Sequence, residues 1–448
     1  MKYISFILMF VCAIVASPFV LLATADDERV HTFESQRKVG QVDHVNILLE
    51  VGGDILAKSG TDEKPQRQEL GLTYRRDYDE KTLMLPTAAE KTLRGIRYYH
   101  SASATGRKGA TVLKPVLGEG SRLVAVEIVG GKETPFSPKG PLGMDELELV
   151  SAVGDSLPLD QLLPGKPVKV GDSWQPADDT LALLLALDEI TSNSVQMALS
   201  EVTPEFARFE LTGQVEGKLF GAGNRISLKA KCRFDRHTGR IDWFAMRLKQ
   251  SRDIGMVEAG IDATVLVQIK INGLDAAEKL SDAALADLPL KPTPELTSIR
   301  YLLSGGGCQL THDRSWFLID ASRDHDEFHR LDRGQDIGLC KISRQPQGDV
   351  AKLPSLEQFR DIVQKLLSDR VSEFVEMAQA ETPAHLRILR LRAKGTDDGV
   401  AVRWFYYLVS DPEGRQAICS FRVEEKCLEQ FGRADEQLVH SLRFVEKK

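Results

Sequence analysis

Apolar and polar residues alternate with a period of two through residues 207–271. The run ARFELTGQVEGKL (207–219) shows the pattern first, and three further runs repeat it up to Ile271. Alternation of this kind is typical of antiparallel strands with one buried and one wet face, whereas parallel strands are apolar on both faces. The pattern therefore predicts a long β-meander with one apolar face.

Another part of the chain must pack against this apolar face to shield it from water. The stretch DDTLALLLALDEI (178–190) starts with acidic residues and continues almost without a polar position, which predicts a buried helix. A curved antiparallel sheet wrapped over this helix would leave a concave apolar face, and we expect that face to bind a ligand. The candidate ligand-binding residues are Phe209, Leu211, Val215, Ile226, Leu228, Phe234 and Val265.

A boundary follows the meander. Residues 274–298 begin with a short helical pattern and end with three prolines, which stop a helix and stiffen an extended linker. The linker separates an expected β-rich domain, residues 26–273, from a second domain, residues 299–448.

Strands and helices alternate in the second domain. PSLEQFRDIVQKLL starts with a capping box, Ser355 with Gln358, and continues with apolar residues at helical spacing. The hairpin AVRWFYYLVSDPEGRQAICSFRVEE has bulky side chains on both faces of its first strand. A strand of this kind is expected in the middle of a sheet with helices on both sides, so its aromatic residues are predicted to be core.

The N-terminus is the most specific signal of location. Lys2 is followed by a long apolar run and by Ala23-Thr24-Ala25, which predicts a cleaved signal peptide over residues 1–25. The run is also about as long as a membrane-spanning helix of ~20 residues, so an uncleaved anchor formed by residues 3–25 stays the alternative. In both cases the rest of the chain is expected in a periplasmic or secreted location, with membrane association if the anchor is kept.

The net charge bears on the possible partners, and the cysteines bear on possible disulfide bonds. The net charge is −7 and no long basic block is present, which argues against nucleic-acid binding. In an oxidising compartment Cys308, Cys340, Cys419 and Cys427 can pair in three ways that the sequence does not distinguish. Cys232 lies on an apolar strand face, where a buried inert thiol is expected.

Five segments of the second domain come in a recognisable order: THDRSW, DIGLCKIS, PSLEQF, WFYYLVSDPEGRQ and DEQLVHSLRF. This order resembles the PsbP-like family, whose fold is an α/β/α sandwich on an antiparallel sheet. Its members are exported accessory or binding proteins without a shared catalytic residue set, so the resemblance implies a non-catalytic protein. Residues 26–273 resemble uncharacterised secreted bacterial proteins and are similar in outline to LolA-type lipoprotein carriers. The expected fold class is α+β.

Catalytic motifs are weak. Gly154-Asp155-Ser156-Leu157 spells the motif of GDSL hydrolases and Asp326-x-x-His329 their acid–base pair, but the surrounding pattern is antiparallel and the two motifs fall in different domains. His325 and His329 have metal-ligand spacing on a helix, yet their charged flanks predict a solvated loop.

We therefore expect no catalytic residue, cofactor or metal, and an exported protein that binds an apolar ligand such as a lipid, or a protein partner. An envelope scaffold without a small ligand is the first alternative, and a hydrolase that uses Ser156 is the second.

Overall fold

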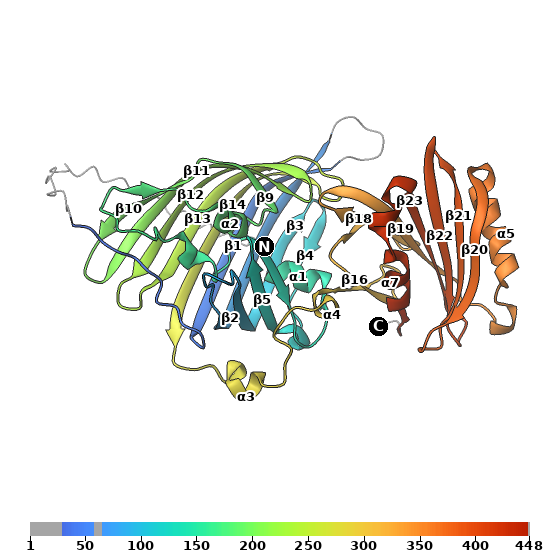
Figure 1. The fold of residues 1–448 in the computed structure, drawn as a ribbon, viewed down its shortest axis with the longest axis horizontal. Coiled ribbons are helices and arrows are strands. Elements are labelled where there is room, and N and C mark those ends of the chain that lie inside the picture. The colour runs from blue at the N-terminus through green and yellow to red at the C-terminus, as the bar shows by residue number, and fades with distance from the viewer. Residues whose placement is uncertain (1–28, 58–64, 447–448) are drawn as a thin grey trace, which may run out of the picture.

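The computed structural model describes residues 29–57 and 65–446, so the expected signal peptide lies outside the described residues. Antiparallel strands dominate, in one sheet of 13 strands, one of seven and one of four (Figure 1). The predicted α+β class is confirmed. Within the described residues no helix combines the length and the apolar character needed to cross a bilayer.

The 13-stranded sheet is built almost entirely from neighbours in sequence, in the order β6-β5-β3-β2-β1-β14-β13-β12-β11-β10-β8. Pairing of the first strand with the last, β1 with β14, joins its two halves. Its strands are β1 (Val42–Ala57), β2 (Gln66–Met84), β3 (Leu93–Lys108), β4 (Thr111–Leu113), β5 (Leu123–Val129), β6 (Lys132–Phe136), β8 (Ser173–Trp174), β9 (Glu189–Asn193), β10 (Gln196–Val202), β11 (Phe206–Leu219), β12 (Ala222–Asp235), β13 (Arg240–Arg252) and β14 (Gly260–Leu274).

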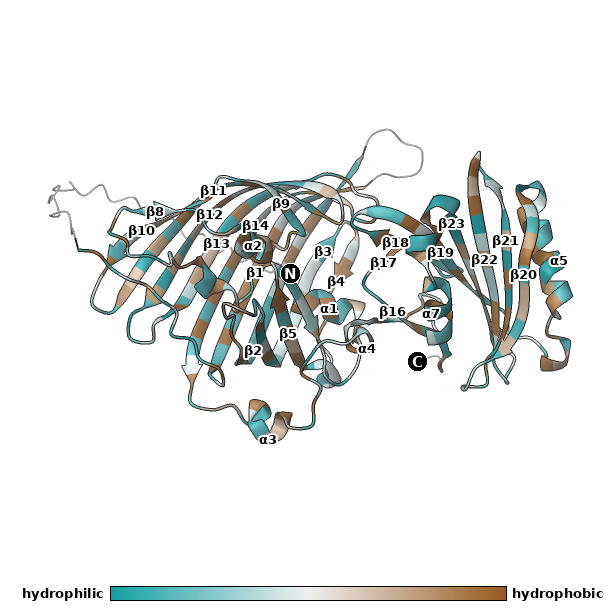
Figure 2. Ribbon diagram, viewed as in Figure 1, coloured by the Kyte–Doolittle hydropathy of each residue, from teal (hydrophilic) through white to brown (hydrophobic). Residues whose placement is uncertain are grey.

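The predicted meander corresponds to β11–β14, and Figure 2 shows apolar and polar positions alternating along these strands. Its apolar side chains belong to one continuous core together with those of α1 (Met144–Val150) and α2 (Asp178–Leu185). The predicted helix over 178–190 is shorter than expected. Ala186 has a left-handed backbone (φ 53°) that ends the helix, and the chain from Glu189 pairs with β11 as strand β9.

The seven-stranded sheet has the order β17-β18-β19-β23-β22-β21-β20. Side chains on one face of β22 (Val400–Ser410), such as Trp404, pack with α5 (Leu356–Leu367). Those on its other face, such as Tyr407, pack with α6 (Leu428–Phe431) and α7 (Ala434–Ser441). The hairpin aromatics are thus core, as predicted. The other strands are β17 (Trp316–Ala321), β18 (His325–Asp332), β19 (Gln335–Gln345), β20 (Val371–Glu381), β21 (Arg387–Asp397) and β23 (Gln416–Glu424).

A four-stranded sheet connects the two large sheets. In it β7 (Leu142–Gly143) pairs in parallel with β15 (Ile299–Leu302), which continues to β16 (Cys308–His312) and β24 (Arg443–Phe444). The expected linker contains the short helices α3 (Asp282–Leu285) and α4 (Pro294–Thr297) and buries leucines against the outer face of β3 and β5. The expected first domain, residues 26–273, therefore contributes strand β7 to a sheet of the expected second domain, residues 299–448. The linker between them is packed against the large sheet along part of its length.

All five cysteines of the described residues are buried free thiols. Burial raises the pKa of each of them above the ordinary value of a thiol, so the reactive thiolate form is disfavoured. The inert thiol predicted for Cys232 fits this environment.

A loop of residues 153–160, here called the clamped loop, is held inside the concave face by ion pairs. Arg97 is fully buried and donates both to Asp155, at 2.6 and 2.7 Å, and to Glu80, at 2.8 Å. Arg76 donates to the carbonyl oxygens of residues 153 and 154 at 2.9 and 2.8 Å. Gly154 fits because it has no side chain, since a Cβ there would lie 2.6 Å from Val267 Cγ1.

Replacement of Arg97 tests this clamp. Arg97→Met leaves the buried carboxylates of Asp155 and Glu80 without their main counter-charge, so we expect the free energy of unfolding to fall by about 3–5 kcal/mol. Lys218→Met, which breaks the exposed pair with Glu189, is the control and should cost less than about 1 kcal/mol in the same urea titration. Equal losses in both variants would contradict the clamp.

A second test uses pH. Burial and the neighbouring negative charge of Asp155 raise the pKa of Glu133 to about 8, from an ordinary value of 4.5. Between these two pH values the folded protein keeps a proton that the unfolded chain has lost, so the contribution of Glu133 to stability falls as the pH rises. Glu133→Gln removes this contribution. Urea unfolding should show the variant gaining stability relative to the wild type from about pH 5 to about pH 8; a constant difference would contradict it.

Candidate metal centre

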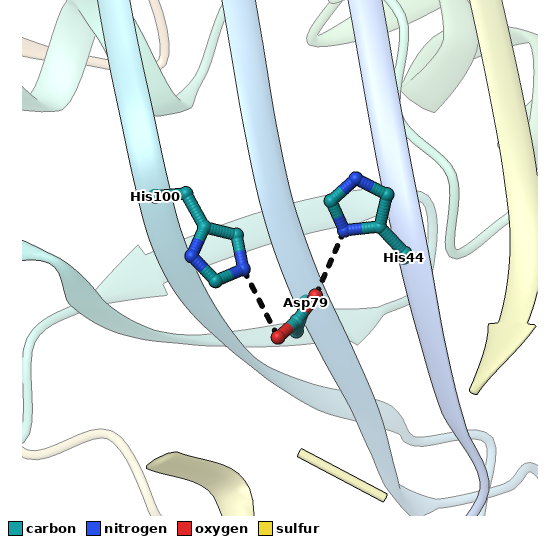
Figure 3. A group of neighbouring side chains, drawn as sticks. All are labelled: His44, Asp79 and His100. Carbon is teal, nitrogen blue, oxygen red and sulfur yellow. Dashed lines mark hydrogen bonds and ion pairs between the residues drawn. The ribbon is translucent and has the colours of Figure 1, made fainter. Parts of the chain in front are cut away.

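Two histidines and one aspartate converge on the outer, polar face of the large sheet (Figure 3). His44 Nδ1 lies 2.9 Å from Asp79 Oδ1, and His100 Nε2 lies 3.0 Å from Asp79 Oδ2. Their donor atoms all lie within 4.8 Å of one another. The side chains of His44, Asp79 and His100 are 29%, 13% and 45% exposed, so solvent reaches the group without unfolding. We call these three residues the metal centre.

Strand pairing positions the three side chains. His44 on β1 is directly opposite Asp79 on β2 in the antiparallel register. His100 comes from β3, where Tyr78 pairs with Tyr99 but Asp77 already pairs with Ser101. This shift is a β-bulge with His100 as the extra residue, and a bulge redirects a side chain at that point of the strand. Tyr99 stays in the apolar core, while His100 is exposed beside Asp79.

The other ring nitrogen of His44 has polar neighbours of its own. His44 Nε2 lies 3.3 Å from the Asn46 amide nitrogen and 3.5 Å from Asp77 Oδ1. Metal-binding histidines commonly donate their second ring N–H to an acceptor, which fixes the ring orientation and leaves the first nitrogen as the ligand atom. Of the two neighbours only the Asp77 carboxylate can accept this hydrogen bond, because the amide nitrogen of Asn46 is a donor. Asp77 is therefore the group that would orient His44 as a metal ligand.

The donor set suits a borderline divalent ion. Two imidazoles and one carboxylate bind Zn²⁺ and other late first-row ions, and three protein ligands leave at least one coordination position open. For donors about 2.0–2.1 Å from the ion, tetrahedral neighbours are roughly 3.3 Å apart, close to the 2.9 and 3.0 Å found here. Small side-chain movements would be enough to admit an ion.

The seven residues expected to bind an apolar ligand lie in packed core instead of an open cavity. Each is at most 4% exposed, and all belong to the cluster that includes the leucines of α2. The sequence shows that these side chains share an apolar face, but the clamped loop and α2 occupy the concave side. The residues in question are Phe209, Leu211, Val215, Ile226, Leu228, Phe234 and Val265.

Ser156 of the GDSL-like motif is fully buried in the ion network. Its hydroxyl donates to Glu80 at 2.9 Å and shares a hydrogen bond with the Tyr78 hydroxyl, also at 2.9 Å. His329 lies in the other large sheet and contacts Asp336 at 3.0 Å. The structure therefore does not bring the serine and this histidine together, and Ser156 contributes to packing of the clamped loop.

His325 and His329 lie on strand β18, so the predicted solvated loop is wrong. Four residues along a strand span roughly 13 Å, too far for two imidazoles to bind one ion. Each histidine faces a separate carboxylate, Asp320 at 3.2 Å and Asp336 at 3.0 Å. The hydrogen bond that Asp336 accepts raises the pKa of His329.

The histidines of the metal centre stand apart from each other and from Asp79 in the sequence. His44 and Asp79 are separated by 35 residues, and no short motif connects them. The usable signal was strand order: polar His44, Asp79 and His100 fall on three successive strands. The correct register of β1 and β2 places His44 opposite Asp79. The bulge at His100 has no recognisable residue pattern in the sequence.

No protein-family model and no curated protein sequence matches this chain. Among solved structures, PsbP (CyanoP) from Synechocystis is 16% identical over 33% of this chain and 92% of that chain, with a TM-score of 0.26. DynF from the dynemicin pathway of Micromonospora chersina is 5% identical over 57% and 90% of the two chains, with a TM-score of 0.17. Salmonella typhi OmpF is 6% identical over 86% and 97%, with a TM-score of 0.14. Likenesses this weak carry no argument about function, and none of the three is a LolA-type carrier.

Proposed function

We propose that this chain is a non-catalytic extracytoplasmic binding protein that holds a divalent transition-metal ion at the metal centre. The observation that carries the proposal is the convergence of two imidazoles and a carboxylate from three adjacent strands on an accessible face. The packed concave face supports a metal ion over an apolar ligand, because a lipid would have to displace α2 and the clamped loop. The N-terminal signal-like pattern supports the location.

The domain division and the PsbP-like assignment belong to this proposal. We assign residues 26–273 to the metal-binding domain, 274–298 to the linker and 299–448 to a PsbP-like α/β/α sandwich. Helices against both faces of the seven-stranded sheet support the sandwich. An accessory role fits both the resemblance and the absence of a shared catalytic residue set in that family.

Zinc titration of the full chain tests the metal centre. Calorimetry should show one Zn²⁺ per protein molecule, and His100→Ala should weaken binding by roughly 10–100-fold or more, because one of three ligands is lost. His385→Ala is the control, since His385 also lies beside a carboxylate, 3.1 Å from Glu381, but is 78% exposed. Equal affinity in both variants, or the lack of any binding, would refute the proposed function.

A protein partner is a second candidate function, favoured by an apolar stripe on α5. Ile362 and Leu366 are 50% and 60% exposed, although the buried Phe359 and Val363 lie on the same helix. The stripe lies near β20, the edge strand of the seven-stranded sheet, where Met377 is 38% exposed. Exposed apolar residues beside an unpaired strand edge are a common feature of protein-binding surfaces.

Site-specific cross-linking tests this surface. A photo-reactive amino acid at Leu366, expressed in the native host, should give a discrete adduct with one partner. The same amino acid at Glu357, an exposed position on the opposite side of α5, is the control. Adducts of equal yield from both positions, or from neither, would contradict partner binding at α5.

A further inference from the structure

A groove of about 760 Å³ crosses the polar face of the large sheet beside the metal centre. Side chains of five consecutive strands, β10 to β14, line it. The lining that matters here consists of Arg208, Lys231, Arg233, Trp243, Lys270 and Asn272. Because these positions alternate with the core residues of the same strands, the groove belongs to the wet face that carries the metal centre.

Strand register connects the groove to the metal centre. Lys270 and Asn272 form its wall on β14, and the next strand in the sheet is β1. Asn272 is directly opposite His44, and Lys270 is directly opposite Asn46. Residues opposite each other in an antiparallel pair have Cβ atoms about 4.5–5.5 Å apart, and diagonal neighbours about 7–8 Å. The Lys270 side chain is long enough to reach the space in front of His44.

The charges of the groove are balanced except at this wall. Arg208 pairs with Glu201 at 2.6 Å, Lys231 with Glu210 at 2.8 Å and Arg233 with Asp242 at 2.7 Å. Lys270 is exposed and forms no ion pair with any residue in the described part of the chain. The groove therefore offers a cation without a counter-ion at the end that adjoins the metal centre.

The polar face also carries a charge arrangement that works against stability. Lys229 on β12 is directly opposite Arg247 on β13, and both side chains are exposed. Like charges placed directly opposite each other destabilise a sheet, although these two residues do not line the groove itself. Further along the same two strands, a bulge where Arg233 pairs with Trp243 places both Asp242 and Trp243 in the lining of the groove, which gives it one large aromatic surface.

We infer that the groove binds an anionic ligand, one that carries a phosphate or carboxylate group, with this group held between Lys270 and the metal ion. The inference rests on the proposed function. Two neutral imidazoles and one carboxylate leave a divalent ion with a net charge of +1 and an open coordination position, and an acid oxygen would fill that position. The rest of the ligand lies in the groove, where Trp243 and the paired arginines contact it.

Cobalt spectroscopy of the full chain tests the inference, because Co²⁺ absorption bands report each ligand of the ion. Co²⁺ is added at one equivalent, followed by inorganic phosphate, glucuronate or vesicles of phosphatidylglycerol in separate titrations. At least one of these anions should shift the cobalt bands. Lys270→Gln should weaken that response by roughly 10–100-fold, as expected for loss of a charge-assisted hydrogen bond. Lys218→Gln, on the same face at the far end of β11, is the control, and Co²⁺ saturation is measured separately in every variant.

The three titrations distinguish the source of the anion, and the cobalt spectrum alone tests the metal centre. A response to phosphate or glucuronate identifies a free anion, and a response to vesicles alone identifies a lipid headgroup; both support the inference. A cobalt spectrum that no anion changes, or that responds equally in Lys270→Gln and Lys218→Gln, overturns the anionic ligand and leaves the metal centre intact. A protein that gives no cobalt spectrum refutes the proposed function, and the inference with it.

Discussion

Arg97 pairs with the carboxylates of Asp155 and Glu80, and this ion network holds the clamped loop inside the large sheet. All three groups are buried, and each would be costly to bury alone. Burial alone would raise the pKa of Asp155, but the charge and hydrogen bonds of Arg97 lower it below its ordinary value. The clamped loop is thereby fixed as a charged segment inside an otherwise apolar concave face.

This clamp determines which side chains of the large sheet solvent can reach. With the clamped loop and α2 packed against it, the concave face consists of core side chains that are almost fully buried. The accessible chemistry is therefore on the outer face, where side chains of successive strands are aligned by register. On that face His44, Asp79 and His100 form one group. The groove ends beside this group, because its lining residues Lys270 and Asn272 on β14 pair with Asn46 and His44 on β1. The sheet thus acts as a rigid frame that holds groups far apart in sequence.

Side-chain polarity along the sequence predicted the strands and several features of the packing. Alternate burial follows directly from period two, so β11–β14 could be predicted from side-chain polarity alone. The bulk on both faces of β22 likewise predicted a central strand, which the burial of Trp404 and Tyr407 bears out. The capping box correctly predicted where α5 begins, but the helical spacing of apolar residues did not reveal that Ile362 and Leu366 are exposed.

The sites could not be predicted because they depend on pairing and not on local pattern. Asp155 and Asp160 are polar loop residues in the sequence, yet Arg97 and Arg37, which are distant in sequence, pair with them in the fold. The Ser156 hydroxyl is held by Glu80 in the same network. The apolar residues of β11 and β12 showed which face is dry but not what fills it. His100 lies beside Asp79 at a bulge, where Tyr78 pairs with Tyr99 but Asp77 pairs with Ser101.

An anomalous difference map of crystals of the full chain grown with Zn²⁺ tests the metal centre most directly. We predict one strong peak bonded to His44, Asp79 and His100 at about 2.0–2.2 Å. A map without a peak there, with both imidazoles still paired to Asp79, would contradict it.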